Sequence, residues 1–104
     1  MSFNIEQTIT GMLDAAKGVF AGEWPMIKDD MKRVLEDEKN ALRDIAEARL
    51  RGDINDEELE EQLKDEKVAF QAGLSMVSAS TKATIQRAID AVSDVFWTAV
   101  KTAI

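Results

Sequence analysis

The centre of the chain repeats one eight-residue pattern: residues 35–42 read LEDEKNAL, and residues 63–70 read LKDEKVAF. Both copies follow L-x-D-E-K-x-A and end on a large apolar residue, and apolar positions spaced by three and four residues are typical of an α-helix. Gly52 lies between the copies and is the residue type that most easily forms the left-handed cap at a helix C-terminus. The repeat therefore predicts two helices joined near Gly52 as an antiparallel hairpin.

The pairing of apolar residues supports this hairpin. An antiparallel turn centred on Gly52 places Leu42 opposite Leu63. The same register places Leu35 opposite Phe70. Each large apolar residue thus meets another, as a buried seam between two helices requires.

Helical periodicity continues through nearly the whole chain, and no stretch of useful length alternates with the period of two that is typical of a strand. We therefore expect an all-α protein: a long antiparallel helical hairpin within a bundle of three helices, or of four, completed by oligomerisation. The expected helices belong to one domain over residues 1–104 and span residues 4–20, 24–51 and 56–103.

The third helix leaves an alternative open. Its apolar stripe keeps phase from Leu59 to Ala103, which favours one continuous helix on the order of 70 Å long at 1.5 Å per residue. That length exceeds the size of a compact monomer, so it predicts a homodimer or a larger homo-oligomer. Weak helix formers gather at residues 73–80, and a break there, capped by Ser78 or Ser80, gives four helices instead.

The corners between the helices carry capping signals. Gly22 is expected to end the first helix, Pro25 suits the first turn of the second, and Trp24 is expected to fill their junction. After Gly52, either Asp53 or Asn55 suits the N-cap of the next helix.

Two glutamates interrupt the apolar faces of the hairpin. Glu38 lies near the centre of the apolar face of residues 24–51, and Glu66 occupies the matching place in the second copy of the repeat. The hairpin register sets Glu38 opposite Glu66. Two ionised carboxylates repel each other there, so the pair requires a shared proton, a neighbouring cation or a bound ion.

Three interpretations of this pair stay open. In a structural interpretation, Glu38 and Glu66 set the register of the helices and reach water, or pair with Lys39, Lys67 or an arginine. In a second interpretation, two hairpins related by a two-fold axis present four glutamates as a metal site. In a third, the pair shares a proton for catalysis, but the sequence offers no accompanying nucleophile or oxyanion donor.

The metal interpretation has a partial precedent. Glu38 and Glu66 from two chains partly resemble the ligand set of ferritin-like di-iron bundles. Those proteins place a histidine three residues after a glutamate, where this chain has Ala41 and Ala69. Only an oxygen-ligated ion such as Ca²⁺, Mg²⁺ or Mn²⁺ then suits the pair.

Composition narrows the remaining functions. The chain has no Cys and no His, which excludes disulfides, zinc fingers and nucleophiles or bases of those residue types. Its net charge of −7 argues against a nucleic-acid partner, because phosphate binding needs a basic surface. The N-terminus does not resemble a secretory signal, and no apolar run reaches the length of a membrane span. We therefore expect a cytoplasmic protein without a cofactor.

The last third of the chain is poor in charge, since residues 68–104 carry only two acids and three bases. Its amphipathic helix predicts either packing in the core of the chain or a subunit interface, in which Trp97 is the exposed anchor. The other expected interface residues are Ile89, Val92, Phe96 and Val100. A membrane-surface helix is a weaker alternative, because such helices usually carry a polar face rich in Lys and Arg.

The predicted function is a non-enzymatic helical assembly or protein-interaction module that acts as a homo-oligomer. The alternatives are a metal-binding bundle centred on Glu38 and Glu66, and a peripheral membrane protein that uses its C-terminal helix.

Overall fold

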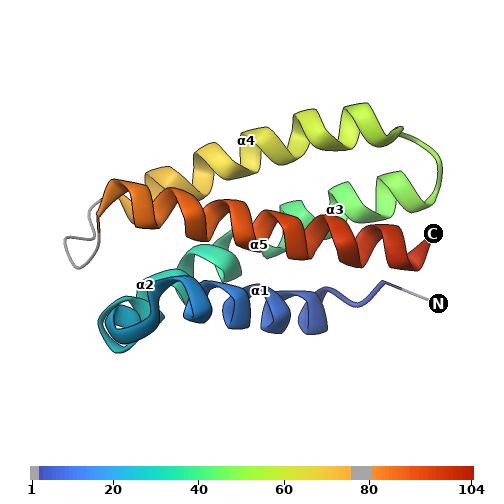
Figure 1. The fold of residues 1–104 in the computed structure, drawn as a ribbon. Helices are drawn as coiled ribbons and strands as arrows, with labels where there is room; N and C mark the ends of the chain where they lie inside the picture. The colour runs from blue at the N-terminus through green and yellow to red at the C-terminus, as the bar shows by residue number, and fades with distance from the viewer. Residues whose placement is uncertain (1–2, 76–80) are drawn as a thin grey trace.

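The computed structural model describes residues 3–75 and 81–104, and every regular secondary-structure element in these ranges is a helix (Figure 1). A short 3-10 helix, η1 (Ala21–Glu23), separates the first two α-helices. The α-helices in chain order are α1 (Ile5–Phe20), α2 (Trp24–Asp37), α3 (Lys39–Leu50), α4 (Asp56–Leu74) and α5 (Lys82–Ala103). The predicted all-α class is confirmed.

The helices form a compact bundle with both chain termini at one end (Figure 1). α1 and α5 run antiparallel and make the most extensive helix pair, while α4 packs against α2, α3 and α5. The described part of the chain measures 40 × 23 × 19 Å and has a radius of gyration of 13.3 Å. A single compact domain of this length has a radius near 13 Å, so the helices close on themselves.

All five α-helices contribute to one apolar core. Its largest fully buried side chains include Met12, Ile27, Met31, Leu35, Leu42, Leu59, Phe70, Leu74, Ile89 and Phe96. Among the described residues, the exposed large apolar side chains are Met26, Val68 and Ile104. The described chain therefore covers nearly all of its own large apolar side chains without a second subunit.

The predicted hairpin corner is confirmed. Gly52 adopts a φ of 82°, which suits glycine because it has no Cβ. Asn55, one of the two expected caps, accepts a hydrogen bond from the Glu58 backbone N–H at 2.9 Å. Glu58 in turn accepts one from the Asn55 backbone N–H at 3.1 Å, which completes a capping box at the start of α4.

The predicted second helix over residues 24–51 is wrong at Glu38, which lies between α2 and α3 with a φ of −98° and a ψ of 2°. No glycine or proline occurs between Pro25 and Gly52, so the local sequence does not demand this break. Both helices pack against α4, and α2 packs more extensively against α1 than α3 does. Tertiary packing therefore sets the end of α2.

The favoured continuous third helix is also wrong, because α4 ends at Leu74 and α5 begins at Lys82. The alternative caps Ser78 and Ser80 lie outside the described residues; the N-cap of α5 is Thr81, whose side chain accepts a hydrogen bond from the Thr84 backbone N–H. The oligomer was expected because of a helix far longer than the 40 Å bundle. That reason for expecting a homo-oligomer no longer holds.

Gly73 has a packing role near the end of α4. A Cβ atom at Gly73 would lie 2.7 Å from Cγ2 of Val34, a buried side chain of α2. The absence of a side chain therefore lets α4 approach α2 closely.

The junction of α1 and α2 follows the prediction except at the residue that ends α1. Trp24 fills the junction by stacking on Phe20, with ring centroids 6.4 Å apart, and Pro25 lies in the first turn of α2 as expected. α1 ends before Ala21 rather than at Gly22, and Ala21 carries a φ of 50°. An alanine Cβ is strained in that conformation, which glycine adopts freely.

We expect Ala21→Gly to stabilise the fold by about 0.5–1 kcal/mol, because it relieves this strain. The matched control is Ala72→Gly, at an exposed position with helical backbone in α4. This substitution should lower the stability of the fold by a similar amount. Urea unfolding followed by circular dichroism measures both. A loss of stability in Ala21→Gly as large as that of the control would contradict a strained Ala21.

Candidate functional site

The structure brings together the two glutamates that the hairpin register predicts to face each other. Glu38 lies at the break between α2 and α3, and Glu66 lies in the middle of α4. Both side chains are half-buried. Their carboxyl groups interact directly enough for Glu38 to perturb the ionisation of Glu66.

Burial and the neighbouring carboxyl group change the charge of this pair. Loss of water contact, followed by the Glu38 carboxyl and then by Asp65, raises the pKa of Glu66 to about 7. Oε2 of Glu66 is buried and has no hydrogen-bond partner among the described residues. A proton shared between the Glu38 and Glu66 carboxyl groups removes the repulsion. Burial and the neighbouring carboxyl group therefore favour a shared proton near neutral pH.

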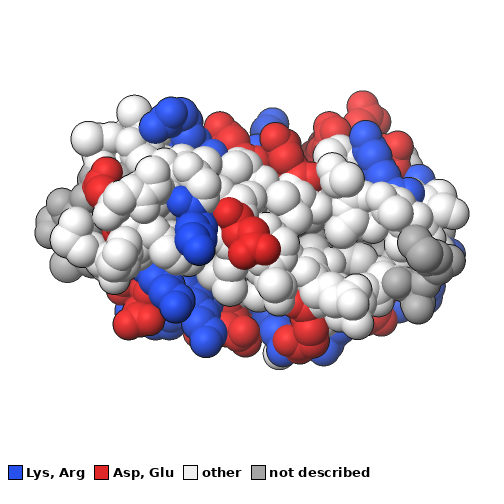
Figure 2. All heavy atoms as spheres, turned by 60° about the horizontal axis from the view of Figure 1, so that its bottom comes forward, with Lys and Arg blue, Asp and Glu red and all other residues white. Residues whose placement is uncertain are grey.

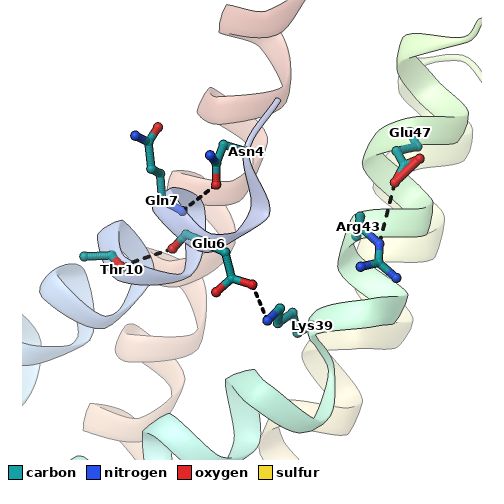
Figure 3. A network of polar contacts seen from close by, with 7 residues as sticks. All are labelled: Asn4, Glu6, Gln7, Thr10, Lys39, Arg43 and Glu47. Carbon is teal, nitrogen blue, oxygen red and sulfur yellow. Dashed lines mark hydrogen bonds and ion pairs between the residues drawn. The ribbon is translucent and has the colours of Figure 1, made fainter. Parts of the chain in front are cut away.

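The lysines that the structural interpretation assigned to the pair bind elsewhere. Lys39 makes its ion pair with Glu6 of α1, and Lys67 makes one with Asp90 of α5 at 3.5 Å. Figure 3 shows the Glu6 side chain reaching from α1 to Lys39 at the start of α3. The Glu6 carboxylate accepts a hydrogen bond from Lys39 and raises the pKa of Lys39. These ion pairs join α1 to α3 and α4 to α5.

The pair provides few ligands for a metal ion. Across residues 3–75 and 81–104, no group of three or more Asp, Glu, His or Cys side chains is placed to hold one. Glu38 and Glu66 together supply two side chains, so Ca²⁺, Mg²⁺ or Mn²⁺ would need further ligands from water or from another chain.

We expect the stability of the protein to fall as the pH rises through the window between 4.5 and about 7. A carboxyl group with a raised pKa in the folded state binds more protons there than the unfolded chain does, so its stabilising contribution is lost as the proton leaves. Glu66→Gln removes this ionisation. The variant should match the wild-type protein near pH 4.5 and be more stable than it near pH 8, as measured by thermal unfolding.

The matched control is Glu61→Gln, which removes the same charge from an exposed position of α4 and should leave the pH slope unchanged. Equal pH slopes in the wild-type protein and Glu66→Gln would contradict the shared proton. Stabilisation of the wild-type protein by millimolar Mn²⁺ or Ca²⁺, absent in Glu66→Gln, would favour the metal interpretation instead.

The predicted interface on α5 needs correction. Ile89, Val92, Phe96 and Val100 are buried in the core of this chain and are not available to a second subunit. Phe96, for example, meets the Phe3 ring edge-on at a centroid distance of 6.1 Å. The apolar face of α5 on which the membrane alternative depends is therefore covered by the rest of the described chain. Among the described helices, none is long and apolar enough to cross a membrane.

Trp97, the expected anchor, lies at the edge of the core. Its side chain is half-buried and packs against core residues, and Nζ of Lys101 lies 4.5 Å from the ring centroid. This cation–π contact occupies part of the indole surface within the chain itself.

The structure adds a groove that sequence periodicity did not indicate. It lies between the first turns of α1 and the last turns of α5, has a volume of about 360 Å³, and carries no charged side chain. Its lining residues are Phe3, Asn4, Gln7, Thr8, Val95, Thr98, Ala99, Thr102 and Ala103. The low charge of residues 68–104 is the feature of the sequence that agrees with an uncharged groove, but low charge alone does not predict where a groove lies.

Comparisons with known proteins do not identify a related protein. No protein-family model matches the chain, and neither a curated protein nor a solved structure matches it. Function is therefore inferred from the fold and the surface alone.

Proposed function

We propose that this chain is a non-enzymatic, cytoplasmic helical interaction module that forms a homodimer through the end of the bundle that holds both termini. The observation that carries the proposal is the uncharged groove between α1 and α5. In a chain with 32% charged residues, none of the side chains that line this groove is charged. Depletion of charge distinguishes the centres of protein interfaces from the rest of a surface.

The surface around the groove supports this location. Figure 2 shows a broad area free of Lys, Arg, Asp and Glu toward the N-terminal end of the face it displays. Charged side chains border that area. An uncharged centre with charged side chains around it fits the depletion of charged residues at the centres of protein interfaces.

A second copy of the chain suits this groove because an apolar side chain stands next to it. Ile104 is 65% exposed and follows Ala103, which lines the groove. A two-fold dimer uses the same patch on both subunits, so a projecting side chain and its acceptor must lie close together. Ile104 and the groove meet this condition.

The contact is expected to be weak. Most large apolar side chains are already buried within the described chain, so a dimer adds little apolar area. The net charge of −7 on each copy also opposes association. Because salt screens this repulsion, dimerisation should strengthen as the ionic strength rises.

We expect Thr98→Lys to weaken dimerisation by about tenfold or more, because it places a charge in the proposed interface. Thr98 is exposed, so the substitution leaves the core intact. The matched control is Val68→Lys, which adds the same charge at an exposed position of α4 outside the groove. Sedimentation velocity at several protein concentrations and salt concentrations gives the dissociation constants.

Two further results decide the proposal. Ile104→Ala should also weaken the dimer, since it removes the inserted side chain. A monomer at all concentrations up to about 1 mM in high salt would overturn self-association. Equal weakening by Thr98→Lys and Val68→Lys would overturn the groove as the interface.

A further inference from the structure

A second pocket lies between α1 and α2, near the junction that Trp24 fills. Its volume is about 250 Å³. The polar and aromatic side chains that line it are Thr10, Asp14, Lys17, Trp24, Lys28 and Lys32. It shares no lining residue with the proposed dimer groove, so the two surfaces can be tested separately.

The pocket is positively charged in an acidic protein. Lys28 and Lys32 are four residues apart and therefore share one face of α2, and Lys17 reaches the same pocket from α1. Within the part of the chain that the structure describes, none of these lysines makes an ion pair, although Lys39 and Lys67 do. Asp14 is the one acidic side chain in the lining. Three cations against one anion leave a local excess of positive charge.

Trp24 contributes an aromatic side chain to the lining of the pocket. Its indole ring stacks on Phe20 with an interplanar angle of 22°, and this contact holds the ring at the start of α2. The indole N–H makes no hydrogen bond among the described residues. A half-buried aromatic ring with an available donor can contact a planar ligand and also bind an oxygen atom.

We infer that this pocket binds a small aromatic anion, namely a single ring that carries a phosphate or a carboxylate. The anionic group lies among the three lysines, where ammonium groups form charge-assisted hydrogen bonds, and the ring lies against Trp24. The pocket is smaller than the roughly 300–1,000 Å³ typical of sites for drug-sized ligands, which limits the ligand to about one ring.

The test uses the ¹⁵N-labelled wild-type protein and phenyl phosphate as the probe. The chain has two tryptophans, so its spectrum contains two indole N–H signals, which Trp97→Phe assigns. Phenyl phosphate at low salt should shift the Trp24 signal in a saturable manner and leave the Trp97 signal in place. Benzoate should act in the same way. Inorganic phosphate and benzyl alcohol, which each lack half of the proposed ligand, should bind at least about tenfold more weakly.

A charge-matched pair of triple variants tests the lysines. Replacing Lys17, Lys28 and Lys32 by Gln should weaken phenyl phosphate binding by about tenfold or more. The control replaces Lys64, Lys82 and Arg87 by Gln, which are exposed residues outside the pocket, and should change binding by less than about twofold. Circular dichroism establishes that both variants are folded.

Each contrary outcome overturns the inference. No saturable shift of the Trp24 signal at about 10 mM phenyl phosphate means that the pocket does not bind this class of ligand. Equal binding of benzyl alcohol means that the lysines do not take part. Equal losses in the two triple variants mean that only the net charge of the protein matters. The comparison of ligands on the wild-type protein remains decisive if a variant does not fold.

Discussion

The fold depends on the packing of α1 against α5, the two helices that lie furthest apart in the sequence. Gly11 of α1 allows this close approach, because a Cβ atom there would lie only 3.3 Å from Cγ1 of Val95. The pairing buries apolar side chains of both helices in one core and brings the two termini to the same end of the bundle (Figure 1). Helices α2, α3 and α4 complete the core around this pair.

This packing decides which surfaces remain for function. The apolar face of α5 turns inward, so the strongest apolar signal in the sequence marks the core and not an interface. What remains outside is the end of the α1–α5 pair, where small and hydroxyl side chains such as Thr98 and Ala99 leave an uncharged groove. At the other end of α1, the contact with α2 places Lys17 beside Lys28. The two proposed binding surfaces are therefore consequences of how α1 is packed.

The sequence was sufficient where local chemistry determines the structure. The left-handed Gly52 and the facing of Glu38 and Glu66 follow from residue type and helical spacing, and residue type narrows the N-cap of α4 to Asp53 or Asn55. It was insufficient where packing across the bundle decides. The apolar residues keep one helical periodicity from Leu59 to Ala103, but this periodicity does not show that α4 ends at Leu74. Two separate helices can bury the same apolar residues as well as one long helix can. Likewise, the amphipathic pattern of a helix does not show whether its apolar face packs against the same chain or against a second subunit.

The carboxyl pair and the break between α2 and α3 occupy the same place, and their energetics are linked. Two ionised carboxylates here would combine repulsion with an unpaired, buried Oε2 atom on Glu66. A single shared proton removes the repulsion, and burial together with the Glu38 carboxyl raises the pKa of Glu66, so the folded chain holds that proton more tightly than a water-exposed glutamate does. The shared proton therefore links Glu38, at the C-terminal end of α2, to Glu66 of α4. Above neutral pH, the repulsion between the two carboxylates acts at the residue where α2 ends and α3 begins.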